Sequence, residues 1–278
     1  MFWPGKALHS GGNPYVESPR HVELGHYLRT RRERIKPETV GLPVNHRRRS
    51  PGLRREEVAF LASVSPAWYS RLEQGNKVRP SSVILDSLAD ALQLDDTERR
   101  YLHALGSDKI STASPPTAPD KRTVALVRNL VEDHGKLPVF AVDGRGDLIS
   151  WNGPTREWYT DFGRRAGHDR NFLWWLLTAE EARVRIADWA AYARDQVAGM
   201  RYAVGTGTID PSVQPMLDEL HEHCAEFREW WETHDVVDQE VATRTFHHPR
   251  QGLRRVDLLT VRPVVSVSLS VVFHRPVT

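Results

Sequence analysis

The sequence predicts two domains: an all-α domain of five short helices, then an α+β domain with an antiparallel sheet and a helical insertion. The chain has 278 residues, and one domain typically holds about 100–200. Apolar residues recur at helical spacing up to about residue 106, whereas the C-terminal runs alternate apolar and polar residues. Between these regions lies GSDKISTASPPTAPD, whose Ser, Thr and Pro content is typical of a linker.

The expected boundaries follow these changes of composition. The N-terminus is rich in Gly and Pro and has little apolar periodicity, as expected of a mobile tail. The sequence therefore predicts a tail over 1–21, an all-α domain over 22–106, a linker over 107–120 and an α+β domain over 121–278.

Each helix of the first domain has a local signal. Residues 22–34 carry apolar side chains at helical spacing, and Pro37 ends that helix. A second helix begins near Leu53, with two glutamates in its first turn. Ser65 is expected to cap a third helix, with a proline at the first helical position and Gly75 just past the end. The fourth and fifth helices have similar caps, from Ser81 or Ser82 and from Asp95 or Asp96.

The second domain is expected to open with a helix over 124–132 and a β-hairpin. The turn sequence Asp143-Gly144-Arg145-Gly146 separates two short apolar runs, 137–143 and 148–151. The last apolar run alternates with serines, which predicts a strand with one buried face. Helical stretches are expected near 154–163, 171–200, 210–223 and 224–234, and strands near 239–248, 253–262 and 264–274.

Charge is distributed unevenly along the chain. Residues 1–110 hold 18 Lys+Arg against 13 Asp+Glu, a net of +5, whereas residues 111–278 hold 20 against 23, a net of −3. Within 20–79 there are 14 basic and 6 acidic residues, a net of +8. Such an asymmetry indicates a polyanionic partner for the first domain.

A helix-turn-helix is predicted within the basic region, in the sequence LRREEVAFLASVSPAWYSRLEQG. Two helices join at a tight turn, and the small Ala59 lies where their backbones must approach, so the second helix can enter the major groove of DNA. Arg71 can bind guanine through two hydrogen bonds, and Ala67 can contact a thymine methyl. The candidate DNA contacts are Ser65, Pro66, Ala67, Trp68, Ser70 and Arg71 on this helix, Arg54, Arg55, Lys77 and Arg79 for phosphates, and Arg47, Arg48 and Arg49 in the preceding loop.

The chain resembles a known family of regulators. Residues 23–105 are similar to the XRE-type, lambda-repressor-like helix-turn-helix, and SPGLRREEVAFLASVSPAWYSRLEQGNKVRPSSVILDSLADALQLDDTERRYLHAL resembles the MmyB-like transcription regulators in particular. LPVFAVDGRGDLISWN, CAEFREWWETHDV and TRTFHHPRQGLRRVDLLTV extend the resemblance to about residues 22–275. It implies a bacterial regulator in which Arg55 clamps a phosphate, and Pro66, Ala67 and Arg71 face the groove. It also implies a PAS-like sensor domain for fatty-acid-like or other small apolar molecules.

Aromatic residues are the candidate walls of a ligand pocket in the second domain. Residues 121–278 hold seven of the nine tryptophans, three tyrosines and six phenylalanines. A small-molecule pocket is mostly apolar with a few placed polar groups, although aromatics also fill cores. The candidate walls are Trp151, Trp158, Phe172, Trp174, Trp175, Trp189, Trp231 and Phe246, and the candidate polar anchors are Asn152, Arg228 and His234.

Other classes of function lack their signals. The chain has no G-x-S-x-G, no G-x-x-x-x-G-K and no G-x-G-x-x-G after a strand, so we expect no enzyme and no cofactor. His221, His223 and Cys224 have no second pair with zinc spacing, so we expect no metal site. No apolar run approaches the about 18 residues of a membrane span. The single cysteine suits a reducing compartment. Together with the lack of a long apolar run, it predicts a cytoplasmic protein.

We therefore expect a transcription regulator that binds double-stranded DNA as a homodimer and senses a small apolar ligand. Two alternatives stay open for the second domain. It can be a dimerisation module without ligand, which makes the protein a constitutive repressor, or a surface for a protein partner.

Overall fold

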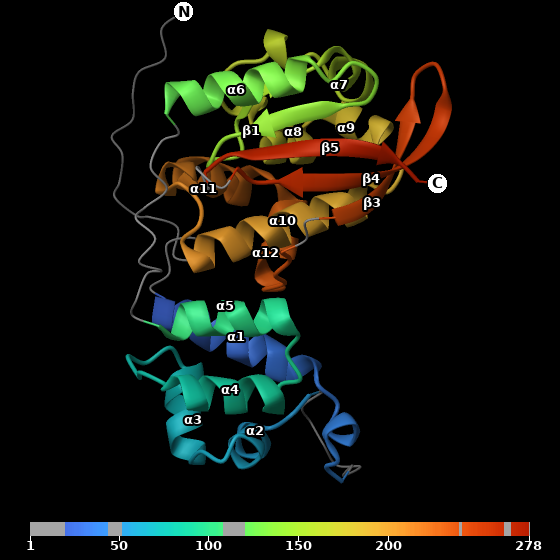
Figure 1. Ribbon diagram of the computed structural model, residues 1–278. Helices are drawn as coiled ribbons and strands as arrows, with labels where there is room; N and C mark the ends of the chain where they lie inside the picture. Colours follow the sequence, from blue (N-terminus) through green and yellow to red (C-terminus); the bar gives the residue numbers. More distant parts are fainter. Residues whose placement is uncertain (1–19, 44–51, 108–119, 239–240, 264–267, 278) are drawn as a thin grey trace, which may run out of the picture.

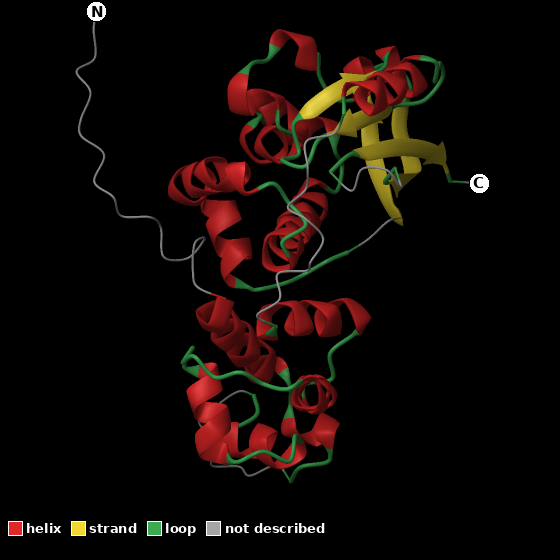
Figure 2. Ribbon diagram, turned by 60° about the vertical axis from the view of Figure 1, so that its left-hand side comes forward, coloured by secondary structure: helices red, strands yellow, loops and turns green. Residues whose placement is uncertain are grey.

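The computed structural model of the chain describes residues 20–43, 52–107, 120–238, 241–263 and 268–277. Almost all of the predicted tail and linker therefore lie outside the described residues, as do Arg47, Arg48 and Arg49. Figure 2 shows that the described strands all belong to the C-terminal domain, whereas the N-terminal domain consists of helices and loops. None of the helices in the described part of the chain is both long enough and apolar enough to cross a membrane.

The N-terminal domain contains the five expected α-helices, and side-chain caps start three of them. Ser65 accepts a hydrogen bond from the amide of Trp68, and Ser81 accepts one from Ile84. Asp95 and Glu98 form a reciprocal capping box. The helices are α1 (Arg20–Arg34), α2 (Arg55–Leu61), α3 (Pro66–Glu73), α4 (Ser82–Ala91) and α5 (Asp96–Gly106), with a short 3-10 helix η1 (Pro37–Val40) after α1.

The C-terminal domain is built on a five-stranded antiparallel sheet with the order β2-β1-β5-β4-β3. Its strands are β1 (Val139–Val142), β2 (Leu148–Trp151), β3 (Val241–His248), β4 (Gly252–Val261) and β5 (Ser270–Pro276). Its helices are α6 (Lys121–Glu132), α7 (Gly153–Trp158), α8 (Phe172–Thr178), α9 (Glu180–Arg185), α10 (Trp189–Thr206), α11 (Gln214–His223) and α12 (Ala225–Glu232), and its 3-10 turns are η2 (Phe162–Arg164), η3 (Gly167–Arg170) and η4 (Pro211–Val213).

Both faces of the sheet are covered where β1 and β5 lie. Val127 and Val131 of α6 pack on Val139 and Val271, and Figure 1 shows α6 lying along this face. The opposite face, which carries Phe140, contacts the larger core formed with the inserted helices. The central strands are therefore buried on both sides, and β3 and the outer face of β4 are the more exposed part of the sheet.

Two predicted elements differ from the structure. The helix expected near 171–200 is broken into α8, α9 and α10, because Ala179 and Ile186 adopt extended backbone conformations, and Ile186 forms a bridge to Phe246 of β3. The strand expected over 264–274 begins at Ser270, and residues 264–267 lie outside the described part. It has two buried faces rather than one, because α6 packs on the face that carries Val271 and the aromatic core packs on the face that carries His274.

The two domains are in direct contact along α10 (Figure 1). Val236 and Tyr202 of the C-terminal domain pack into the core of the N-terminal domain. Around this apolar contact, Arg31 and Arg34 of α1 bind the carboxylate of Asp235, at 3.3 Å and 2.5 Å. Apolar packing and ion pairs thus fix the position of one domain against the other.

Candidate functional site

The helix-turn-helix is formed by α2 and α3 and the short turn between them. Ser63 adopts the left-handed conformation with φ of 55°, and the amide of Val64 donates to the carbonyl of Ala59 at 2.9 Å. The turn between α2 and α3 is therefore tight, and α3 begins directly after its N-cap, Ser65. The sequence-predicted pair of helices is present, with Ala59 fully buried where they meet.

One side of α3 is buried and the other is free to enter a groove. Tyr69, Leu72 and Glu73 are buried in the domain core, whereas Arg71 is exposed. Because the helix is amphipathic, its sequence-predicted DNA contacts share the outer side. Ser65, Pro66, Ala67 and Arg71 are exposed, and Trp68 and Ser70 are half-buried at its edge.

A buried ion-pair network fixes α3 against the other helices. The fully buried Glu73 carboxylate accepts hydrogen bonds from Arg32 of α1, at 2.6 Å and 2.8 Å, and from Arg55 of α2 at 2.7 Å. Burial alone would raise the pKa of Glu73, but these hydrogen bonds hold it below its ordinary value. The orientation of the recognition helix is therefore set by charged groups that cannot easily be rearranged.

Exposed cations lie on both sides of α3 in the sequence. Arg54 and Arg55 are at the start of α2, and Lys77 and Arg79 follow α3, and all four are exposed. Nε of Arg55 is bonded to Glu73, and 43% of the Arg55 side chain remains exposed. These positions suit contacts to the DNA backbone, which orient a reading helix without reading sequence.

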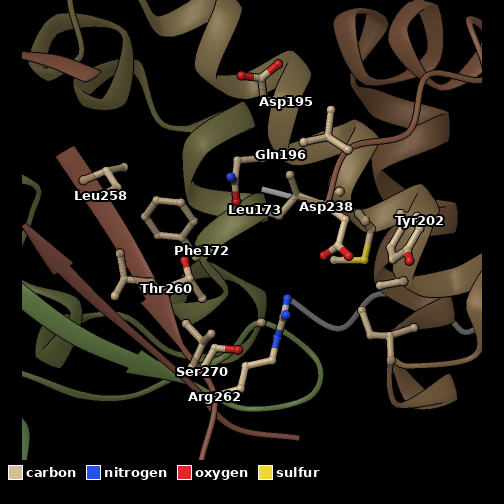
Figure 3. Close-up of a pocket in the computed structure, with 18 of the residues that line it drawn as sticks. Phe172, Leu173, Asp195, Gln196, Tyr202, Asp238, Leu258, Thr260, Arg262 and Ser270 are labelled. Carbon is tan, nitrogen blue, oxygen red and sulfur yellow. The ribbon is translucent and has the colours of Figure 1, made fainter. Parts of the chain in front are cut away.

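The C-terminal domain contains a cavity of about 510 Å³ on the inner side of the sheet. Figure 3 shows it between β4, β5, the start of α8 and the side of α10. Its volume is within the range of about 300–1,000 Å³ that is usual for small-molecule sites. Much of its wall is apolar, formed by Phe140, Val142, Phe172, Leu173, Met200, Ile209, Leu258 and Val272.

Two arginines differ in how they face this cavity. Arg244 is bound to the carboxylate of Asp195, and its guanidinium lies 4.9 Å from the centre of the Tyr192 ring. Arg262 follows β4, and Figure 3 shows its side chain extending toward the middle of the cavity. Within the described residues Arg262 makes no ion pair, so its charge is available to an anionic ligand.

Five of the sequence-predicted pocket walls lie buried in the packed core: Trp158, Phe172, Trp175, Trp231 and Phe246. Trp158, Trp175 and Phe246 surround Tyr159 and the fully buried His274 in a continuous aromatic cluster. Ring centres in this cluster are 5.2–6.2 Å apart, which is usual for aromatic packing. Of the predicted walls, Phe172 is the one that also lines the large cavity.

Three other predicted tryptophans, Trp151, Trp174 and Trp189, are partly buried against this core. Trp189 donates to the carbonyl of Leu176 at 2.7 Å, and Trp174 donates to Asp169 at 3.1 Å. Trp231 stacks on a neighbouring phenylalanine of α12. Trp151 lines a different hollow, of about 480 Å³, beside the β1–β2 turn.

The three predicted polar anchors are engaged elsewhere. Asn152 caps α7 through Thr155 and also binds the carbonyl of Leu137 at 2.8 Å. Arg228 donates to the carbonyl of His221 at 2.9 Å, and His234 lies at the interface between the domains. None of the three is among the residues that the structure places around the large cavity.

The side of α10 that lines the cavity was not predicted from the sequence, and two of its residues are small. On α10 the lining residues Gln196, Gly199, Met200 and Ala203 recur at three- and four-residue spacing and so share one side of the helix. Glycine and alanine leave space where a bulkier residue would fill it. The four-residue spacing of Gly199 and Ala203 on one side of α10 is a signal in the sequence that could have indicated the cavity.

A cluster of Glu23, His26 and His234 brings three possible metal ligands within 4.8 Å of one another at the domain interface. Arg201, however, donates both to the Glu23 carboxylate and to Nδ1 of His234. Burial would raise the pKa of Glu23, but Arg201 and His234 lower it to about 2. The guanidinium already supplies the positive charge, and the cluster links α1 of one domain to α10 of the other.

These features define a DNA-binding transcription regulator with a second domain for a small molecule, and comparison with known proteins agrees. Residues 23–102 match a helix-turn-helix domain, and residues 125–278 match the MmyB-like transcription regulator ligand binding domain. The chain therefore belongs to the MmyB-like transcription regulators, a family of regulators and not of enzymes. A search among curated proteins finds no match.

Proposed function

We propose that this regulator binds its operator as a dimer through α3, and that a fatty-acid-like molecule in the large cavity alters that binding. Arg71 reads a base in the major groove, while Arg54, Arg55, Lys77 and Arg79 contact phosphates. A single short recognition helix reads few base pairs, so two copies on two half-sites supply the specificity.

The cavity is the observation that supports the sensor role most strongly. Its apolar wall suits an alkyl chain, and the side chain of Arg262 reaches into it without an ion-pair partner among the described residues. A carboxylate head at Arg262 would gain a charge-assisted hydrogen bond. The proposed ligand class is thus an alkyl chain with an anionic head.

The test begins with the purified full chain. Native mass spectrometry followed by denaturing extraction is expected to release a bound carboxylate. Tryptophan fluorescence titration then compares dodecanoate with dodecanol. We expect Arg262→Gln to weaken dodecanoate binding about tenfold or more, since a hydrogen bond to a charged group contributes about 1.5–3 kcal/mol. Dodecanol binding should change little, because it lacks the charge.

Arg255→Gln is the matched control, because Arg255 is an exposed arginine of β4, the strand that Arg262 directly follows, and does not line the cavity. It should bind dodecanoate as the wild type does. Equal weakening by the two variants would contradict a specific anchor. A wild type that binds neither probe and carries no extracted molecule would favour a domain that serves dimerisation or a protein partner instead.

A further inference from the structure

We infer that Tyr202 and Asp238 transmit occupancy of the cavity to the DNA-binding domain through Arg100 of α5. The inference rests on the proposed function, because it concerns the same ligand cavity. Both side chains line the cavity and are labelled in Figure 3. Both also bond to the guanidinium of Arg100, which belongs to the other domain. A ligand that contacts either residue therefore contacts a group that already bridges the domains.

The bridge is direct and lies at the rim of the domain interface. Nε of Arg100 donates to the hydroxyl of Tyr202 at 3.3 Å, and Nη2 lies 3.4 Å from Oδ2 of Asp238. The side chains of Arg100 and Asp238 are 54% and 27% exposed, so the bridge can be rearranged without unpacking a core. Exposed pairs of this kind are weak, which allows a ligand to compete with them.

Next to the Arg100 bridge, α10 packs closely on α5, and this contact would transmit a small movement of α10. The Tyr202 ring stacks on Tyr101 of α5, with ring centres 6.1 Å apart, and Tyr101 is buried in the N-terminal core. Three residues further along α10, Gly205 lies so close to Tyr101 that an added Cβ would fall well within 3.0 Å of the ring. Because no space separates the two helices here, a shift of α10 must move α5.

A second connection runs through the segment after α12. Val236 is buried in the N-terminal core, whereas Val237 and Asp238, the next two residues, line the cavity. Tyr202 of α10 and the segment after α12 thus belong both to the cavity wall and to the domain interface. The cavity and the DNA-binding domain share a boundary rather than being connected through a long chain of contacts.

The charges give the ligand a preference between two arrangements. An anionic head at Arg262 would add a negative charge to the cavity that the Asp238 carboxylate lines. Their repulsion opposes the arrangement in which Asp238 faces the cavity and pairs with Arg100. A ligand can shift an equilibrium only by binding one state more tightly, and this repulsion supplies such a difference.

The test measures coupling in the full-length protein. A duplex is first selected from random-sequence DNA by the wild type, and its Kd is then measured by fluorescence anisotropy with and without saturating dodecanoate. The ratio of the two values is the coupling factor, which we expect to be about fivefold or more in the wild type. Arg100→Gln and Tyr202→Phe are expected to bring this factor to within about twofold of one.

Arg99→Gln is the matched control for charge and position. Arg99 is the preceding residue of α5, and it pairs with Asp86 and Asp90 within its own domain. It should keep the wild-type coupling factor although it loses the same charge. Hydrogen exchange of residues 96–106 gives a second readout: dodecanoate should change the protection of α5 in the wild type and in Arg99→Gln but not in Arg100→Gln.

The two hypotheses fail in different ways. If the wild type shows no effect of dodecanoate on DNA binding, the proposed function is overturned and the inference falls with it. If the wild type shows coupling and Arg100→Gln and Tyr202→Phe retain it, the proposed function stands and the inference is overturned. Loss of coupling in Arg99→Gln to the same extent would also overturn it, because any charge on α5 would then suffice.

Discussion

Arg71 is the side chain on which sequence-specific binding is expected to depend. It lies on the exposed side of α3, two residues before the buried Glu73 that fixes the helix. Its guanidinium can form two hydrogen bonds to guanine, which discriminate against a wrong base by about 1–3 kcal/mol. We expect Arg71→Ala to weaken binding to a selected operator by that amount and to change binding to random DNA much less, as measured by fluorescence anisotropy.

Lys77→Ala provides the contrast, because Lys77 is exposed and follows the helix. Loss of a phosphate contact should weaken binding to every sequence and reduce the slope of log K against log salt by about one unit. The assignment of base reading to Arg71 would be wrong if both variants lost affinity equally on operator and random DNA.

His274 makes the stability of the C-terminal domain depend on pH. It is fully buried in the aromatic cluster, and Nε2 lies 2.5 Å from the Tyr159 hydroxyl. Burial lowers its pKa to about 3, from the 6.5 of an exposed histidine. Below pH 6.5 the unfolded chain therefore takes up a proton that the folded chain refuses, so the stabilisation is complete above pH 6.5 and is lost as pH falls toward 3.

The expected loss from this one group is about 2 kcal/mol between pH 7.5 and pH 5. It can be measured as the change in free energy of urea unfolding followed by tryptophan fluorescence. His274→Gln should be less stable than the wild type at pH 7.5, but its free energy of unfolding should fall by about 2 kcal/mol less over the same interval. Parallel pH dependence in the two proteins would show that His274 titrates normally.

At the scale of helices, α5 and α10 are held at a distance that only glycine permits. A Cβ at Gly205 would overlap the ring of Tyr101, which is itself buried. We expect Gly205→Ala to destabilise the docked arrangement by about 1–3 kcal/mol, the usual cost of overpacking. A lower midpoint of thermal unfolding of the full chain would show it.

Gly199→Ala on the same helix is the control, because its nearest neighbour, the carbonyl of Val237, would be 3.7 Å from the new Cβ. That substitution should leave the midpoint unchanged or raise it, since alanine favours a helix by up to about 1 kcal/mol over glycine. If the two alanines had the same effect, the packing of Gly205 on Tyr101 could not be what sets the distance between the helices.

Helix starts could be predicted because they depend on nearby residues. Ser65 and Asp95 each bind an amide three residues ahead, so the sequence of one turn contains the whole interaction. The break of the long helix at Ile186 could not be predicted in this way. It depends on a bridge to Phe246, sixty residues later in the chain. Strand order has the same origin, because β5 pairs with β1 across the entire helical insertion.

The two candidate sites differ in the same respect. The exposed side of α3 could be predicted, because one helix with a period of 3.6 residues and a basic flank carries all of it. The cavity wall combines β1, β3, β4, β5, α8 and α10, so it is assembled from segments that are far apart in the sequence. The sequence analysis assigned the pocket wall to large aromatic residues, but Trp158 and Trp175 fill the packed core instead. Which residues of such distant segments line the cavity cannot be decided before the fold is known.

In the molecule as a whole, the excess of basic residues and the apolar cavity lie in different domains. The net charge of +8 lies in residues 20–79, and the cavity lies beyond residue 139. A polyanion and an apolar molecule can therefore bind at the same time. The ion pairs of Glu23 with Arg201 and of Arg31 with Asp235 join the two domains.

A dimer of chains joined in this way would fix the spacing of its two reading helices, and the operator should reflect that spacing. We expect DNA selected by the wild type to contain two half-sites related by a two-fold axis, with centres about 10–10.5 base pairs, or a multiple, apart. Inserting five base pairs between them turns one half-site to the opposite side of the duplex and should reduce affinity to that of a single half-site. Inserting ten, the control, restores the side and should restore part of the affinity. Equal affinity for all three spacings, with one chain bound per duplex by native mass spectrometry, would mean that the protein reads DNA as a monomer.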